Sequence, residues 1–187
     1  MSNYRNWIVF FSILPIVFLV GCGPAQQSAE QAPPSAEPKS KMAHANLQPT
    51  EGNAVQGTAH FEEIRGELHV EIKLTGLTPG KHGFHVHETG DCAAPDASSA
   101  GGHFNPEGKP HGAPGAAEHH VGDLGNVEAN AAGQAETDLH FDFLTMDGPN
   151  SIIGKAVVVH AGEDDLQSQP TGNAGARVGC GVIGIAR

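Results

Sequence analysis

Apolar and polar residues alternate over several short stretches of this chain. The most regular is residues 68–75, where every second residue is Leu, Val or Ile. A period of two predicts a β-strand with one buried face. The same alternation in residues 139–143 and 156–160, and around Val182 and Ile185, predicts further strands. Spacing typical of an amphipathic helix is hard to find, so the pattern predicts an all-β domain.

The strand pattern is interrupted by two long polar stretches. Residues 89–119 are rich in Gly, Ala, Pro and Asp, and residues 161–177 are polar and contain glycine. Short strands in a chain with 25 glycines are typical of an antiparallel barrel or sandwich. Long loops in a compact domain usually carry function. We therefore expect one β-domain with two functional loops.

The N-terminal part of the chain has a different pattern. Residues 8–20 form an apolar run of 13 residues, which suits the core of a signal peptide and is shorter than a bilayer span. The run ends at Gly21-Cys22 in a sequence, LVGC, that resembles a bacterial lipobox. The alternative is an uncleaved anchor helix, and either interpretation predicts a domain outside the cytoplasm.

The lipobox resemblance divides the chain into three parts. We expect a signal peptide at 1–21, a lipidated Cys22 followed by a flexible tether to residue 45, and a folded domain at 46–187. The tether is predicted from its Ala, Pro, Gln, Ser and Glu content, which lacks apolar periodicity. The protein would then be exported and lipid-anchored to a bacterial membrane, facing the periplasm or the cell exterior.

The cysteines predict a disulfide, and the net charge limits the kinds of partner that the protein can bind. If Cys22 carries a lipid, Cys92 and Cys180 remain as a pair in an oxidising compartment, and we expect a disulfide between them. The formal net charge of −11 argues against nucleic acid as a partner. A small anionic substrate would need local electrostatic steering.

Seven residues have spacings typical of metal ligands. His85 and His87 share one face of a predicted strand, and His160 ends another, so three imidazoles should converge at the mouth of a barrel. His103, His111, His120 and Asp123 form a set that suits a closed zinc site. An isolated His-x-His is weak evidence by itself, because such motifs often occur in proteins without a metal.

Two four-coordinate sites require eight ligand positions from these seven residues. One imidazole must therefore serve both ions through its two nitrogens, and His103 lies between the two sets in the sequence. A bridging imidazole has lost both ring protons, which two adjacent dications can offset. We expect a bridge at His103 that can later accept a proton.

Four segments resemble copper/zinc superoxide dismutases in sequence, order and separation. They are residues 83–88 (GFHVHE), 102–106 (GHFNP), 120–123 (HVGD) and 172–177 (GNAGAR), and the resemblance extends over about 54–187. It implies an eight-stranded antiparallel Greek-key barrel, an immunoglobulin-like sandwich, with one copper and one zinc ion per subunit. The short segment 167–170, the placement of Cys92 directly after Asp91 and the lipobox-like LVGC resemble bacterial, lipoprotein-type members.

The resemblance also implies the reaction and the ligands. Two superoxide anions and two protons become dioxygen and hydrogen peroxide by alternating reduction and oxidation of copper, which protects the extracytoplasmic space. The implied copper ligands are His85, His87, His103 and His160. The implied zinc ligands are His103, His111, His120 and Asp123. His103 would leave copper and be protonated during the cycle.

The resemblance alone implies functions for two further residues. Asp164 would hydrogen-bond both His85 and His111, and Arg177 would attract and bind superoxide. The segment 167–170 is short and lacks the charged residues of animal-type members, so steering rests on Arg177 nearly alone or on Arg177 helped by lysines such as Lys109 or Lys155. A homodimer is compatible with the resemblance, but no motif fixes the assembly.

The other histidines have no motif partner. We expect them to be solvated or hydrogen-bonded within the domain: His44, His60, His69, His82, His119 and His140.

Two other functions fit parts of the pattern. A metal buffer or delivery protein needs the ligands but neither Arg177 nor a shared His103. A zinc hydrolase needs an open zinc position, whereas this zinc set is complete. The sequence therefore favours the dismutase.

Overall fold

The computed structural model describes residues 40–186, which fold as a β-domain. Its strands are β1 (Lys41–Pro49), β2 (Gln56–Ile64), β3 (Glu67–Thr75), β4 (Gly80–His87), β5 (Asp123–Ala129), β6 (Ala135–Phe141), β7 (Ala156–His160), β8 (Arg177–Val182) and β9 (Gly184–Ile185). One 3₁₀ turn, η1 (Ser98–Ala100), is the one helical element in this range. No helix among these residues is long and apolar enough to cross a membrane.

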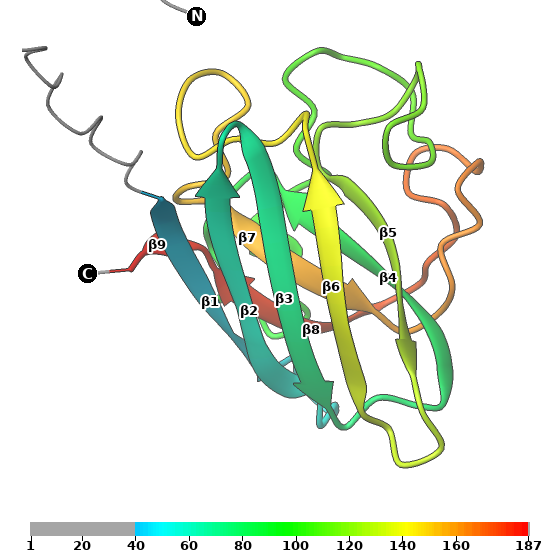
Figure 1. Ribbon diagram of the computed structural model, residues 1–187. Helices are drawn as coiled ribbons and strands as arrows, with labels where there is room; N and C mark the ends of the chain where they lie inside the picture. The colour runs from blue at the N-terminus through cyan, green and yellow to red at the C-terminus, as the bar shows by residue number, and fades with distance from the viewer. Residues whose placement is uncertain (1–39, 187) are drawn as a thin grey trace, which may run out of the picture. The chain divides into compact units, whose positions relative to one another are not determined.

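The strands form a nearly closed antiparallel barrel. Their order is β5-β4-β7-β8-β1-β2-β3-β6, with β9 paired to β1. Figure 1 shows β1, β2, β3 and β6 side by side, with β4, β7 and β8 crossing behind them. The β3–β4 and β6–β7 connections pass from one layer to the other, as in a Greek key. The predicted all-β, eight-stranded antiparallel barrel is confirmed.

The alternating residues of β3 explain the core. Leu68, Val70, Ile72 and Leu74 are buried inside the barrel, while the polar residues between them point outward. From the other layer, Phe84 and Val86 of β4 and Val157 and Val159 of β7 pack into the same core. A smaller cluster lies outside this wall and contains Ala97, Ala100, Ala156, Val158 and Cys180.

This arrangement corrects the expected position of the first histidine group. In β4, the core takes Phe84 and Val86, so the alternate residues His85 and His87 face outward. His160 lies on the outer side of β7 for the same reason, because Val159 faces the core. The three imidazoles therefore lie on the outer wall of the barrel beneath the two long loops, and not at its mouth.

Two further sequence expectations differ from the structure. The strand β1 begins at Lys41, inside the segment 22–45 expected to be a tether. Its inward residues include Ala43 and Ala45, which are too small to give a clear apolar signal. Val182 and Ile185 are exposed and Ile183 between them is buried, because Val182 ends β8 while Ile185 lies in β9, so the two are not alternate residues of one strand. Residues 1–21 and Cys22 lie outside the described residues.

Candidate functional site

The site begins on the outer face of two paired strands. β4 and β7 are antiparallel neighbours, with His85 opposite Val158 and His87 opposite Ala156. The register of β4 against β5 shifts between Gly83 and His85, and that of β7 against β8 shifts next to His160. Such bulges redirect side chains and are frequent beside functional sites. Here they aim imidazoles from two strands at one point.

His103 reaches this point because the first long loop returns along β4. An isolated bridge pairs His103 with His87, and the Phe104 amide donates to the Val86 carbonyl oxygen at 2.8 Å. The Val86 amide in turn donates to the carbonyl oxygen of Gly122 at 2.9 Å. A side chain at Gly122 would collide with the Val86 carbonyl, so the close approach requires glycine.

The structure brings the seven predicted ligands into two groups that share His103. We call His85, His87, His103 and His160 the copper group. We call His103, His111, His120 and Asp123 the zinc group. Within each group, one ligand atom per residue lies within 4.8 Å of the others, and all seven residues are buried.

In His85, His87 and His160, one ring nitrogen is engaged by a carboxylate or a backbone carbonyl, and the other ring nitrogen is left to face the copper group. His87 Nδ1 donates to the Gly101 carbonyl oxygen and His160 Nδ1 to that of Gly175, both at 3.0 Å. His85 Nε2 donates to Asp164 at 2.8 Å. The remaining nitrogens are Nε2 of His87, Nε2 of His160 and Nδ1 of His85. The two Nε2 atoms lie 3.4 Å apart.

The zinc group converges on one carboxylate oxygen. Asp123 Oδ1 lies 2.8 Å from His103 Nδ1, 3.0 Å from His111 Nδ1 and 3.4 Å from His120 Nδ1. Ligand atoms about 2 Å from a tetrahedral zinc ion are separated by about 3.3 Å. The distances from Asp123 Oδ1 to the three rings therefore fit a tetrahedral zinc site.

The residues also fit metal ions by their unsatisfied atoms. Four buried ring nitrogens have no hydrogen-bond partner in the part of the chain that the structure describes: His85 Nδ1, His103 Nε2, His111 Nδ1 and His120 Nδ1. Buried polar atoms normally have partners, so four orphans in one place need an explanation. Each lies in one of the two groups, where a metal ion would satisfy it.

Asp164 links the two groups from the second loop. Its Oδ2 accepts from His85 Nε2 at 2.8 Å and its Oδ1 accepts from His111 Nε2 at 3.0 Å. Asn126 of β5 holds the backbone of Asp164 by two bonds, at 2.8 and 2.9 Å. Gly172 packs against this pair at φ +63°, and a side chain there would collide with Asp164 and His111.

Burial sets the protonation of the copper group. It lowers the pKa of His85 to about 4, of His87 to about 2 and of His160 to about 3. The neutral imidazole is the form that binds a metal ion. These three rings therefore stay available as ligands at and well below neutral pH.

In the zinc group, the pKa of His111 shifts in the opposite direction to those of the copper-group histidines. Burial opposes the charged ring, but the nearby carboxylates of Asp123 and Asp164 raise the pKa of His111 to about 9. Burial likewise opposes the charged form of Asp123, but the hydrogen bond from His103 and the close ring of His111 hold the pKa of Asp123 well below its usual range. The group therefore keeps an anionic ligand suited to a dication.

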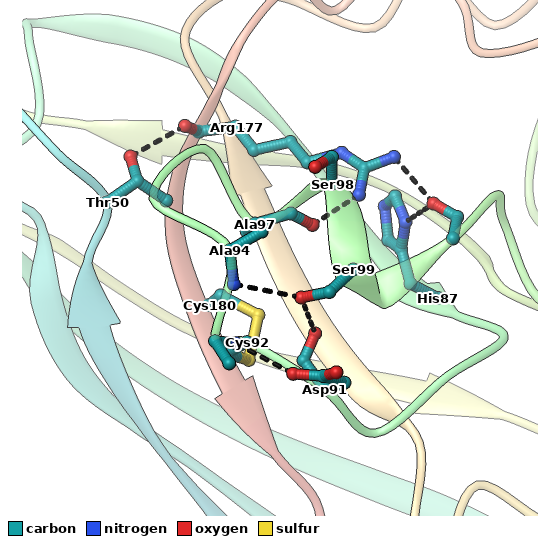
Figure 2. Close-up of a disulfide and its surroundings, with 12 residues drawn as sticks. Thr50, His87, Asp91, Cys92, Ala94, Ala97, Ser98, Ser99, Arg177 and Cys180 are labelled. Atoms are coloured by element: carbon teal, nitrogen blue, oxygen red, sulfur yellow. Dashed lines mark hydrogen bonds between the residues drawn. A yellow bond between two sulfur atoms is a disulfide. The ribbon is translucent and has the colours of Figure 1, made fainter.

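Arg177 lies beside the copper group and is held by backbone carbonyls. Its guanidinium donates to the carbonyl oxygens of Ala97 and Gly101, each at 2.5 Å. Gly101 also accepts from His87, so one carbonyl orients both side chains. Figure 2 shows Arg177 and His87 approaching this shared acceptor. Burial lowers the pKa of Arg177, and the charge of Asp96 opposes that shift.

A disulfide fixes the loop that supplies these carbonyls. Cys92 and Cys180 are bonded, with Cα atoms 5.8 Å apart, which joins the loop to β8. In Figure 2 the disulfide lies below Ala97 and Arg177. The Ala94 amide donates to Ser99 Oγ at 3.1 Å, and Ser99 Oγ donates to the Asp91 carbonyl oxygen at 3.0 Å. The loop is thus braced internally as well.

A surface cavity of about 910 Å³ lies beside Arg177. Its lining includes two acidic residues, Glu51 and Asp96, and Arg177 is the one basic residue among the described residues that line it. The two lysines considered as helpers of Arg177 are engaged elsewhere. Lys109 pairs with Glu107 at 2.6 Å, and Lys155 lies 4.1 Å from the centre of the Phe104 ring.

Two unassigned histidines near the ligands are satisfied without a metal. His82 donates from Nδ1 to the His160 carbonyl oxygen at 2.8 Å, and its Nε2 lies 2.8 Å from the Thr78 carbonyl oxygen. His119 Nδ1 donates to the His120 carbonyl oxygen at 2.7 Å, and its ring packs on Phe143. His120, and not its neighbour, therefore points into the zinc group.

Sequence reasoning missed a residue that joins the two loops. The Gln169 side chain accepts from the His111 amide at 2.8 Å and donates to the His111 carbonyl oxygen at 2.9 Å. It thereby clamps the backbone of one ligand from both sides. In the sequence, the segment 167–170 is notable only for its lack of charged residues, and no motif marks an amide side chain that bonds backbone atoms.

Comparison with known proteins agrees with this geometry. Residues 55–183 match the family model of copper/zinc superoxide dismutase (SODC). "Superoxide dismutase [Cu-Zn] 2" of Mesembryanthemum crystallinum is 50% identical over 140 residues, covering 71% of this chain and 89% of the relative. "Extracellular superoxide dismutase [Cu-Zn]" of Brugia pahangi is 45% identical over 157 residues, covering 79% and 78%.

A solved structure is similar as well. The crystal structure of the clock protein EA4 gives a TM-score of 0.72 at 46% sequence identity, and the match covers 78% of this chain and 94% of that one. The two sequence relatives come from a plant and a nematode. The resemblance to bacterial lipoprotein members therefore stays a prediction.

Proposed function

This chain belongs to the copper/zinc superoxide dismutase family, and we propose that it converts two superoxide anions and two protons into dioxygen and hydrogen peroxide. The observation that carries the proposal is the membership of His103 in both ligand groups, next to the fixed guanidinium of Arg177. A protein that only stores metal requires neither feature.

The proposed ligands follow from the free ring nitrogens. Copper would be held by His85, His87, His103 and His160. Zinc would be held by His103, His111, His120 and Asp123. When bound, copper supplies one-electron redox chemistry, and zinc supplies a redox-inert positive charge on the other side of His103.

Arg177 attracts and orients the substrate. Superoxide is a small anion, and the domain is acidic overall, so the approach needs local positive charge. Two carbonyl bonds fix the guanidinium beside His87 before substrate arrives, which reduces the entropy lost on binding. The arginine then donates hydrogen bonds to the bound anion.

His103 holds and moves a proton. Its Nδ1 faces Asp123 and remains with the zinc group, whereas its buried Nε2 has no hydrogen-bond partner among residues 40–186. A proton carried on Nε2 lies on the substrate side and can pass to the reduced oxygen species. Asp123 keeps the ring in one orientation throughout, so Nε2 returns to the same place.

Metal-dependent activity tests the proposal. The chain loaded with copper and zinc should consume superoxide catalytically and release hydrogen peroxide, while the same preparation loaded with zinc alone should not. Equal inactivity of both preparations, at one copper and one zinc per chain, would favour a metal buffer or delivery protein.

We propose further that the protein is exported and lipid-anchored through Cys22. Support comes from the apolar run at 8–20, the lipobox-like LVGC, and the name of the extracellular relative from Brugia pahangi. The Cys92–Cys180 disulfide also suits an oxidising compartment. The signal peptide at 1–21 and a tether that ends before Lys41 complete the proposed organisation.

Metabolic labelling tests the anchor. In a bacterial host, the chain should incorporate labelled fatty acid and partition with membranes, and Cys22→Ser should abolish both. Labelling that survives Cys22→Ser would contradict the proposed lipid site.

A further inference from the structure

A third cluster of ligand-type side chains lies on the outer face of β3 and β6. His69 of β3 and His140 of β6 are directly opposite in the antiparallel register, and their ring centroids are 4.1 Å apart. Glu67 lies two residues before His69 and so faces the same side. Figure 1 shows β3 and β6 as neighbours in the layer away from β4 and β7. The cluster is therefore separate from the copper and zinc groups.

The three side chains present ligand atoms to one point. Glu67 Oε2 lies 3.8 Å from His69 Nε2, and Glu67 Oε1 lies 3.6 Å from His140 Nδ1. One ligand atom from each residue lies within 4.8 Å of the other two. The side chains are partly exposed, with His69 at 29%, His140 at 46% and Glu67 at 51%. An ion could therefore enter directly from solvent.

A second carboxylate supports His140 from its other side. Asp138 Oδ2 lies 3.6 Å from His140 Nε2, while Nδ1 faces Glu67. A metal-binding histidine usually directs its other ring nitrogen to a carboxylate or carbonyl, which orients the ring and makes it a stronger ligand. Asp138 lies on this side of His140, just beyond hydrogen-bond distance of Nε2.

The surrounding charge favours a cation. Glu71 lies opposite Asp138 and Glu136 opposite Lys73 on the same pair of strands. Lys73 is engaged by the carboxylates of Glu71, at 2.5 Å, and Glu136, at 3.6 Å. The face keeps excess negative charge beside the two histidines.

We propose that Glu67, His69 and His140 bind a divalent late transition-metal ion, with water in the remaining positions. Two imidazoles and one carboxylate suit zinc or copper(II), whereas magnesium and calcium prefer oxygen ligands alone. Copper(II) should bind more tightly than zinc by the general order of affinities. The site does not depend on the proposed dismutase activity.

Zinc binding to the full chain tests this proposal. The protein is first saturated with one copper and one zinc ion, and a zinc titration is then followed by calorimetry. We expect one further zinc ion to bind. His69→Ala and His140→Ala should each weaken this binding at least about ten-fold, and Asp138→Asn should weaken it by about ten-fold through the ring orientation.

The controls separate this site from other effects. His44→Ala removes an exposed histidine of β1 and should leave the further zinc ion bound. All variants should keep the superoxide activity of the parent, which shows that they fold. The proposal is overturned if the saturated parent binds no further zinc, or if His69→Ala and His140→Ala bind it as tightly as the parent.

Discussion

At the scale of single residues, Arg177 owes its position to backbone carbonyls and not to a carboxylate partner. Among the described residues, no carboxylate forms an ion pair with the Arg177 guanidinium. The negative charge of Asp96 is close enough to act on its pKa without touching it. An uncompensated guanidinium beside a metal group is well suited to an anionic substrate. This separates Arg177 from the paired surface lysines.

Replacing this charge should slow the reaction without removing metal. Arg177→Ile should lower kcat/KM for superoxide by about ten-fold or more, and should weaken its dependence on ionic strength. Copper and zinc contents should not change. Lys41→Met, which removes the same charge far from the site, should leave the rate unchanged. An unaffected rate in Arg177→Ile would show that steering lies elsewhere.

Asp96 provides the opposite test of the same electrostatic idea. Asp96→Asn retains an oxygen that can accept from the Ser98 amide, but it removes a negative charge from the cavity beside Arg177. We expect kcat/KM to rise by a few-fold at low ionic strength, with the gain disappearing in high salt. Stopped-flow measurements of superoxide decay would show both effects.

At the scale of elements, the two long loops hold the site together by contacts to each other and to the barrel. The first loop supplies His103 and the carbonyls that hold Arg177, while the second supplies Asp164 and Gln169. Hydrogen bonds, the disulfide and the buried Ala97 and Ala100 together hold the loops on the barrel. Changes far from the metals should therefore alter metal binding.

The Gln169 clamp should control zinc retention. Gln169→Ala removes both bonds to the His111 backbone and should weaken zinc binding about ten-fold, as lost supporting contacts do in other zinc sites. Competition with a zinc chelator measures the effect. Gln167→Ala, whose exposed side chain makes no such clamp, is the matched control. Equal zinc affinity in the two variants would remove the role assigned to Gln169.

The disulfide should affect both stability and rate. Replacing Cys92 and Cys180 by serine opens a link between residues separated by 88 positions, and should lower the free energy of unfolding by about 4 kcal/mol. Denaturant unfolding measures this loss. The rate should also fall, because the loop carrying the Ala97 and Gly101 carbonyls is released. A folded variant with full activity would show that the other loop bonds suffice.

At the scale of the whole molecule, the sequence predicted the architecture where the apolar signal was strong. β3 and β7 were clear because branched apolar residues alternate or run together there. β1 was missed because Ala43 and Ala45 give little contrast with their neighbours. The two ligand groups were also foreseen, because histidine spacing and the family resemblance pointed to the same residues.

Other features depend on tertiary structure and left no local signal. The outer-wall position of the copper group follows from which side of β4 faces the core, which periodicity alone does not decide. The Gln169 clamp joins residues 58 positions apart. The pairing of His69 with His140 depends on the register of β3 against β6.

The metal-free protein should be most stable near neutral pH. His85, His87 and His160 have pKa values lowered by burial to about 4, 2 and 3, so the unfolded chain binds more protons below about pH 6.5. Stability should fall as the pH drops from there. His111, with a pKa raised to about 9, contributes stability that is lost as the pH rises through 9. Urea unfolding across this range should show a maximum; a flat profile would contradict these shifts.

The most direct test of the central claim is the superoxide decay rate of His160→Ala, measured with its copper and zinc contents. His160 belongs to the copper group alone. We predict loss of copper binding and of activity, with zinc retained and the fold intact, while His44→Ala behaves as the parent. Full activity in His160→Ala would contradict the assignment of the redox site.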